Sequence, residues 1–155
     1  MILKEAEKQE IKKLQQQEQT CVQKYEKYSQ DAKDPVLKEL FLTIKKDEEK
    51  HYQTLEQILT GIVPSCDCND SKGKNYKPIA TYNQLDNSED KKSDNFLATD
   101  SIGTEKMVSS GYNSGVFAIA NSDIRKVLAD IQIEEQNHAD MIYKYRVANG
   151  MVEAS

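Results

Sequence analysis

A pattern of glutamate and histidine that occurs twice constrains this chain more than any other feature. Glu18 is followed 30 residues later by Glu48, and His51 comes three residues after that. The same pattern, E-x29-E-x2-H, recurs at an offset of 87 residues and includes the only other histidine of the chain. The two copies consist of Glu18, Glu48, His51, Glu105, Glu135 and His138.

Each Glu-x-x-His pair is expected to direct a carboxylate and an imidazole the same way, because positions three apart share one face of an α-helix. The glutamates lie within stripes of apolar residues, so they should face the interior of a helical bundle. Buried carboxylates cost several kcal/mol each unless they are paired or bound to metal. Two divalent cations would neutralise four of them. Four carboxylates and two imidazoles are the ligand set of a di-metal site in a four-helix bundle.

The position of each ligand predicts its role. Glu48 and Glu135 share their helices with the histidines and are expected to bridge the two ions. Glu18 and Glu105 are expected to be terminal ligands, and each histidine should bind one ion. Mixed carboxylate and imidazole ligands favour iron or manganese over zinc. The ligands alone do not choose between the two, and we expect iron first, with manganese as the alternative. Two plainer interpretations stay open: a site that no longer binds metal, and surface Glu–His pairs worth a few tenths of a kcal/mol.

Two tyrosines and a cysteine follow the lone glutamates closely along the chain. Tyr25 and Tyr112 each come seven residues, or two helical turns, after one of them. As buried phenols they could hydrogen-bond to the ligand carboxylates, or they could pack in the core and find another acceptor. Cys21 is expected to be a small buried apolar residue. Cys66 and Cys68 form a C-x-C in the expected crossover and are expected to be free loop thiols; the alternatives are that they cross-link proteins or bind a soft metal. Three cysteines make neither a disulfide framework nor a rubredoxin-type iron site.

Apolar periodicity predicts four long helices. They are expected over residues 3–32, 35–60, 93–120 and 122–149. The expected N-caps of the last three are Asp34, Ser93 or Asp94, and Asn121 or Ser122. Phe96 should lie on the inner face of the third helix. Gly111 and Gly115, four residues apart, should let that helix approach a neighbour closely.

Residues 62–92 contain Pro64 and Pro78, are rich in Asn, Asp, Ser, Lys and Gly, and show no sustained period. About 30 residues without regular structure is long for a compact domain. A bundle whose second and third helices are parallel needs such a crossover. We therefore expect one all-α domain over residues 1–155, an antiparallel four-helix bundle. Its parts would be a helix hairpin at 3–60, the crossover at 61–92 and a second hairpin at 93–149.

Core positions repeat at the same offset as the ligands. Leu37 corresponds to Ile124, and Ile44 corresponds to Ile131. Because ligands and core residues repeat together, the sequence indicates that the second hairpin is a duplicate of the first.

Composition excludes several classes of function. The net charge is -5 and no stretch is strongly basic, which argues against a nucleic-acid partner. The N-terminus lacks the apolar segment of a signal peptide, and no apolar run approaches membrane-spanning length. We therefore expect neither a secreted nor a membrane protein. Charged residues make up 30% of the chain, which predicts a heavily charged helical surface.

The two halves resemble the ferritin-like superfamily, and especially the rubrerythrin-type di-iron proteins. The second half is also similar to the spore coat protein F family. That similarity rests on T-E-K at 104–106, G-Y-N at 111–113 and I-E-E-Q-N-H-A-D-M-I-Y-K-Y at 133–145, followed by N-G-M. The resemblance implies a ferritin-like bundle in the mother-cell cytoplasm or the spore coat. Its partners would be other coat proteins or further copies of the chain.

The chain departs from the rubrerythrin pattern in two respects. That family has an additional glutamate one turn after the position of Glu105, where this chain has Val108. The ligand shift that the family uses during peroxide reduction is therefore not implied. The sequence also lacks the cysteine pairs of a rubredoxin domain, so a redox cycle would need an external electron donor.

Two functions follow as hypotheses. In the first, the protein is an oxidoreductase of the peroxidase or oxidase type, whose two iron or manganese ions consume O2 or peroxide. In the second, it is a structural spore coat component in which the metal site only stabilises the bundle or is vestigial. The intact set of six ligands favours the first, and the coat-protein resemblance favours the second. A regulatory or partner-binding function has only the polar crossover to support it.

Overall fold

The structure is a computed structural model that describes residues 3–65 and 71–153. Within these ranges the chain forms five helices and no strand, as the all-α prediction required. The helices are α1 (Glu5–Asp31), α2 (Pro35–Leu59), α3 (Ser71–Asn75), α4 (Glu89–Ala118) and α5 (Ser122–Ala148). None of the described helices is both long and apolar enough to span a membrane.

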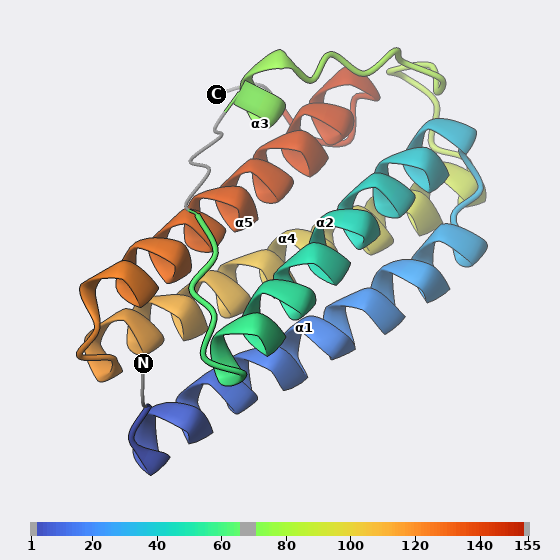
Figure 1. Ribbon diagram of the computed structural model, residues 1–155. Helices are drawn as coiled ribbons and strands as arrows, with labels where there is room; N and C mark the ends of the chain where they lie inside the picture. Colours follow the sequence, from blue (N-terminus) through green and yellow to red (C-terminus); the bar gives the residue numbers. More distant parts are fainter. Residues whose placement is uncertain (1–2, 66–70, 154–155) are drawn as a thin grey trace.

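The four long helices lie side by side as two antiparallel hairpins, α1 with α2 and α4 with α5 (Figure 1). Helices α2 and α4 run in the same direction, so the chain must return along the whole bundle between them (Figure 1). This parallel arrangement is the reason for the long crossover. The core between the hairpins is filled by aliphatic side chains and by large aromatic ones. The largest fully buried aromatic side chains are Tyr25, Phe41, Tyr112 and Tyr145.

Two of the predicted N-caps are confirmed. The carboxylate of Asp34 accepts the N–H of Val36 at 2.9 Å, at the start of α2. The side chain of Asn121 accepts two backbone N–H groups at the start of α5. Each side chain satisfies amide groups that the first helical turn leaves without a partner.

The predicted start of the third long helix is wrong. Helix α4 begins at Glu89, and the hydroxyl of Ser88 caps it by accepting the N–H of Lys91 at 3.2 Å. Two acidic residues in its first turn, Glu89 and Asp90, suit the positive end of the helix dipole. Ser93 lies within this helix, where its short polar side chain resembles a cap in sequence alone.

Asp94 is a buried helix residue rather than a cap. Its two carboxylate oxygens accept the N–H groups of Lys33 and Asp34, each at 2.8 Å, in the loop between α1 and α2. At an offset of 87 residues, Glu7 makes the matching contact and accepts the N–H of Ala120 at 2.8 Å, in the loop between α4 and α5. Each hairpin therefore binds the loop of the other hairpin through one carboxylate. These two contacts are also related by the 87-residue offset, so the duplication includes positions that the sequence analysis did not use.

The prediction for Phe96 is also wrong, because its side chain is 67% exposed. Stepping back from Glu105 by three or four residues at a time reaches Ser101, Leu97 and Asp94, and all of these are buried. The inner face of α4 thus contains polar residues near its start. An apolar stripe drawn through Phe96 is displaced by one residue, or about 100° around the helix.

Gly111 and Gly115 lie where α4 meets α1. A Cβ atom on Gly115 would come within 3.0 Å of Leu14 Cδ1, and one on Gly111 would come within 2.5 Å of Gln17 Oε1. The close approach predicted for these two glycines is confirmed.

The crossover is more ordered than predicted. It contains the short helix α3, which lies against α5 (Figure 1). The Lys144 ammonium group donates to the carbonyl oxygen of Gly73, in the middle of α3. Further along, the N–H groups of Thr81 and Tyr82 both donate to Asn149 Oδ1, at 2.9 and 3.0 Å. These contacts are with residues about 70 positions away, and periodicity within the segment could not reveal them.

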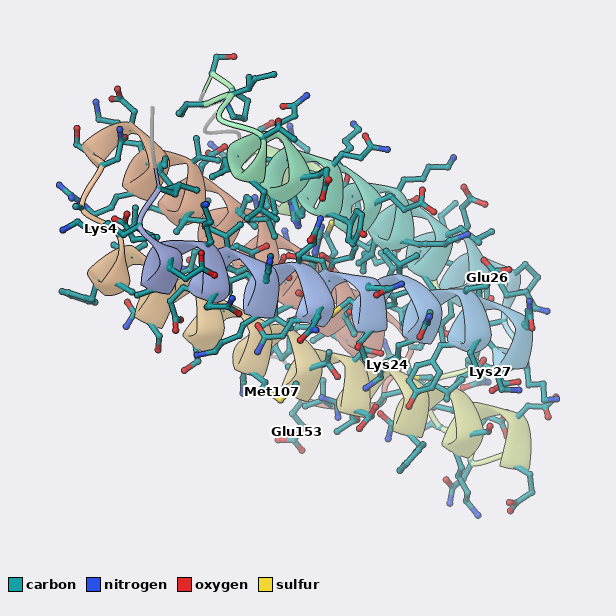
Figure 2. The ribbon with its side chains drawn as sticks, turned by 60° about the horizontal axis from the view of Figure 1, so that its bottom comes forward. Lys4, Lys24, Glu26, Lys27, Met107 and Glu153 are labelled. Carbon is teal, nitrogen blue, oxygen red and sulfur yellow. The ribbon has the colours of Figure 1, made fainter. Side chains whose placement is uncertain are left out.

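The outer surface is as heavily charged as predicted. Figure 2 shows Glu26 and Lys27 of α1 projecting away from the bundle. Glu26 pairs with Lys45 of α2 at 2.8 Å, and Lys27 pairs with Asp31 at 2.9 Å. Exposed pairs of this kind contribute only about 0–1 kcal/mol each, so burial in the core must supply most of the stability.

Candidate metal centre

Every long helix contributes to one cluster of acidic and imidazole side chains in the core. Helix α1 supplies one glutamate, α4 supplies one, and α2 and α5 each supply a Glu-x-x-His pair. All six residues are at least 97% buried, and the structure brings their side chains together. They are Glu18, Glu48, His51, Glu105, Glu135 and His138.

The six residues form two overlapping groups, in each of which four potential ligand atoms lie within 4.8 Å of one another. The first group is Glu18, Glu48, His51 and Glu135. The second group is Glu48, Glu105, Glu135 and His138. Glu48 and Glu135 belong to both, and this is the arrangement that bridging carboxylates require. Either group could hold a metal ion.

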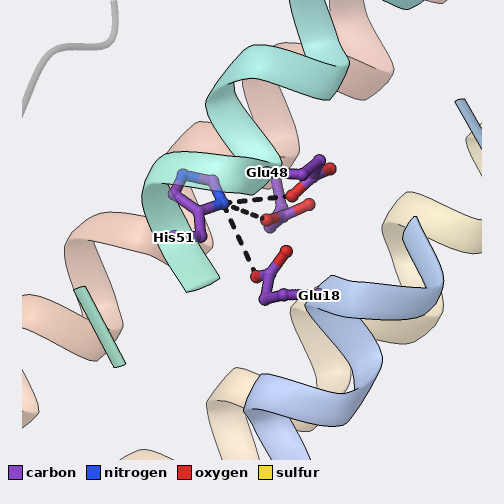
Figure 3. A group of neighbouring side chains, drawn as sticks. Glu18, Glu48 and His51 are labelled. Atoms are coloured by element: carbon purple, nitrogen blue, oxygen red, sulfur yellow. Dashed lines mark hydrogen bonds and ion pairs between the residues drawn. The ribbon is translucent and has the colours of Figure 1, made fainter. Parts of the chain in front are cut away.

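His51 turns its Nδ1 atom toward the carboxylates (Figure 3). This atom lies 3.1 Å from Glu48 Oε2 and 3.5 Å from Glu18 Oε1. It also lies 2.9 Å from Glu135 Oε1, on the facing hairpin. Three carboxylates from three helices therefore converge on one ring nitrogen.

His138 repeats this geometry in the second group. Its Nδ1 atom lies 3.3 Å from Glu48 Oε1, 3.5 Å from Glu105 Oε1 and 3.8 Å from Glu135 Oε2. The two imidazole rings lie side by side, with centroids 6.0 Å apart and planes inclined by 28°.

Two further carboxylates hold the opposite edges of the rings. His51 Nε2 lies 2.8 Å from Glu134 Oε2, and His138 Nε2 lies 3.1 Å from Asp47 Oδ2. An acceptor at Nε2 fixes the ring orientation and leaves Nδ1 free to bind metal. The sequence interpretation missed both residues. They were detectable, because an acidic residue directly precedes the glutamate of each Glu-x-x-His pair, again 87 positions apart.

The two tyrosines connect the hairpins at the cluster. The hydroxyl of Tyr25 donates to Glu105, and the hydroxyl of Tyr112 donates to Glu18. Each tyrosine thus contacts the lone glutamate of the opposite hairpin. Burial and the nearby glutamates raise the pKa of both phenols, so both keep the proton that they donate.

The cluster is electrostatically crowded. Burial, together with the charge of Glu48, raises the pKa of Glu18 to about 8. Burial and the charge of Glu105 raise the pKa of Glu135 to about 7. Burial also opposes the charge of Glu48, but contacts with both imidazoles outweigh it and lower the pKa of that carboxyl. Burial would lower the pKa of the histidines, whereas their contacts with surrounding carboxylates raise it well above the usual range.

Contacts within the cluster do not provide a hydrogen bond for each of its buried polar atoms. Several lack a hydrogen-bond partner of good geometry among the described residues, although buried polar atoms nearly always have one. In the cluster these atoms are Glu18 Oε2, Glu48 Oε1, Glu105 Oε2, both carboxylate oxygens of Glu135, and His138 Nδ1. Unpaired oxygen and imidazole donors that face one another suit divalent iron or manganese. The side chains present therefore fit a pair of metal ions.

Three further sequence expectations concern cysteines and a valine. Cys21 is a buried free thiol, as expected, and burial raises its pKa. Val108 is a buried residue of α4, and its apolar side chain has no atom that could bind a metal ion. Cys66 and Cys68 lie outside the described residues.

Removing either tyrosine hydroxyl should weaken both the fold and metal binding. Tyr25→Phe or Tyr112→Phe would leave a glutamate oxygen without its donor, which costs about 1–3 kcal/mol of unfolding free energy. Loss of such an outer contact also lowers metal affinity by about 10–100-fold. Denaturant unfolding and metal titration would measure the two effects. Tyr28→Phe is the control, because Tyr28 donates to Asp100 at 2.7 Å away from the cluster; an equal loss there would contradict the prediction.

One known family is similar to the second hairpin. Residues 93–155 match the Coat F domain, and the matched range covers nearly all of α4 and the whole of α5. Searches of curated proteins and of solved structures found no match. The second half of this chain is therefore similar to the Coat F domain, and that half contains Glu105, Glu135 and His138.

Proposed function

We propose that this protein is a ferritin-like bundle that binds two iron or manganese ions and uses them to react with O2 or peroxide. The observation that carries the proposal is the pair of overlapping buried groups, which share Glu48 and Glu135. A site for a single ion would not need two shared carboxylates between two histidines.

Each side chain of the centre would have a defined task. Glu48 and Glu135 would bridge the ions, Glu18 and Glu105 would be terminal ligands, and each histidine would bind one ion through Nδ1. Tyr25 and Tyr112 would hold the terminal carboxylates in place. A bound pair of redox-active ions would supply the electrons that O2 or peroxide accepts, and an external donor would restore them.

The similarity to the Coat F domain supports association with the spore coat. There the metal centre would protect the spore from oxidants. The protein would be deposited in the coat or stay in the mother-cell cytoplasm. It would act as one four-helix domain, in contact with other coat proteins or with further copies of itself.

A structural function is the second candidate. The Coat F match favours it, and so does Val108, which stands where rubrerythrins have an additional glutamate. In this case metal would bind the folded state alone and stabilise it by linkage, with no redox turnover.

Metal analysis and peroxide turnover of the same samples would test the proposal. We expect two ions per chain in the wild-type protein, and loss of both ions and of turnover in Glu48→Ala, because Glu48 belongs to both groups. Glu49→Ala is the matched control: it is the next residue of α2, and its side chain is 45% exposed. Two bound ions without turnover under any donor would favour the structural function. Absence of metal from the wild-type protein would refute both metal-dependent functions.

A further inference from the structure

A cavity of about 420 Å³ lies between α2 and α5, on the outer side of the candidate metal centre. Helix α3 borders it through Lys72, and α3 lies over α5 in Figure 1. The cavity wall contains three acidic residues. The polar residues that matter are Asp47, His51, Asp130, Glu134, His138 and Lys72.

The two imidazole rings separate this cavity from the buried glutamates. Both histidines line the cavity, and their Nε2 atoms contact Glu134 and Asp47, which line it too. Their Nδ1 atoms point the other way, into the cluster. An ion that passed between the rings would therefore leave the cavity and meet the ligands directly.

Asp130 is not one of the six candidate ligands of the centre, and its surroundings would stabilise a bound cation. It is only 8% exposed, and its Oδ1 atom has no hydrogen-bond partner among the described residues. Asp47, by contrast, accepts from the Lys72 ammonium group and contacts His138. A buried carboxylate oxygen without a partner is costly, so a cation that contacted this oxygen would be stabilised here.

The position of Asp130 suits an ion on its way to the centre. It lies one turn before Glu134 on α5, so the two carboxylates share a helix face. Neither residue belongs to the two groups with converging ligand atoms, so an ion held here would keep its water shell. Six waters at about 30 Å³ each occupy about 180 Å³, which fits the cavity. The corresponding position in the first hairpin is Thr43, so α2 has no counterpart of the Asp130 carboxylate.

We infer that the cavity between α2 and α5 is the uptake site for divalent cations, where Asp130 and Glu134 hold a hydrated ion before it passes between His51 and His138. This inference rests on the proposed di-metal function. Lys72 and Lys50 also line the cavity, and Lys72 is engaged by Asp47. Asp47 contacts Lys72 and His138, and Glu134 contacts His51, so Asp130 is the acidic residue of the cavity wall whose carboxylate can attract a cation.

The test is the rate at which metal-free protein takes up Co²⁺, followed by absorbance after rapid mixing. Asp130→Asn should slow uptake about tenfold, the lower range of electrostatic effects on association. Release of Co²⁺ to a chelator should slow by the same factor, so two ions per chain and the dissociation constants should be retained. A residue with a purely structural role would change the dissociation constants or the melting temperature instead.

Two further variants complete the experiment. Asp130→Glu restores the charge and should return uptake toward the wild-type rate. Asp123→Asn removes the same charge from an exposed position of α5, where the side chain is 69% exposed, and should leave uptake unchanged. Unchanged uptake in Asp130→Asn would overturn the uptake site alone. Failure of the wild-type protein to bind Co²⁺ would overturn the metal centre and the uptake site together.

Discussion

Adding excess Mn²⁺ or Fe²⁺ under anaerobic conditions will raise the melting temperature of the metal-free protein by about 16–32 °C. At free metal of about 1,000 times the dissociation constant, each site adds about 4 kcal/mol of unfolding free energy. For a chain of this size, each kcal/mol shifts the midpoint by about 2–4 °C. The shift is large because metal replaces repulsion among four buried carboxylates with attraction. Calorimetry with and without metal would measure it.

Glu135→Gln should abolish most of this shift, because Glu135 belongs to both ligand groups. The substitution keeps the shape of the side chain and removes one of the crowded charges, so the metal-free protein should remain folded. Glu49→Gln, on the exposed side of α2, should leave the shift intact. An equal metal-induced shift in Glu135→Gln and wild type would show that the ions bind elsewhere.

The metal-free protein should become less stable as the pH rises from about 4.5 to 8, by several kcal/mol, because each raised pKa contributes roughly 1.4 kcal/mol per unit. The folded-state pKa values of Glu18 and Glu135 are raised from 4.5 to about 8 and about 7. The folded state then binds more protons than the unfolded state, so stability falls with pH. The histidines act in the same direction above their ordinary pKa of 6.5. Glu48, whose pKa is lowered, acts in the opposite sense only below about 4.5.

Bound metal should reverse this dependence, because metal binding requires deprotonated ligands and releases protons. Stability of the loaded protein should therefore rise over the same pH range. Urea unfolding at pH 5, 6, 7 and 8 would measure both trends. In Glu18→Gln the slope of the metal-free protein should be shallower, whereas Glu10→Gln, at the surface of α1, should not change it. A metal-free protein that gained stability toward pH 8 would contradict the assigned charge states.

The site was more predictable from the sequence than the ends of the helices were. A glutamate within an apolar helical stripe is easy to recognise. Because the stripe occurs twice, the sequence also shows which glutamates lie on the inner face of their helices. The start of α4 was not conspicuous, since Ser88, Ser93 and Asp94 are all good caps by residue type. Only the contacts of Asp94 with Lys33 and Asp34, about 60 residues away, show that it is an interior residue.

The crossover shows the same limit. Helix α3 has five residues and no period of its own. Its position depends on Lys144 and on the cavity-facing contact between Lys72 and Asp47. Asp47 and Glu134 could have been predicted, because both precede a glutamate of the pattern. Asp130 could not, since it has no acidic counterpart in the first hairpin. It is notable only because it is buried and its Oδ1 atom has no hydrogen-bond partner in the part of the chain that the structure describes.

Each ligand group draws on both hairpins, and this has a consequence for how the molecule holds together. The first group takes three residues from α1 and α2 and one from α5, while the second takes one from α2 and three from α4 and α5. Each ion would thus be a reversible cross-link between the two halves of the chain. The supply of metal in the cell would then set how firmly one hairpin stays attached to the other.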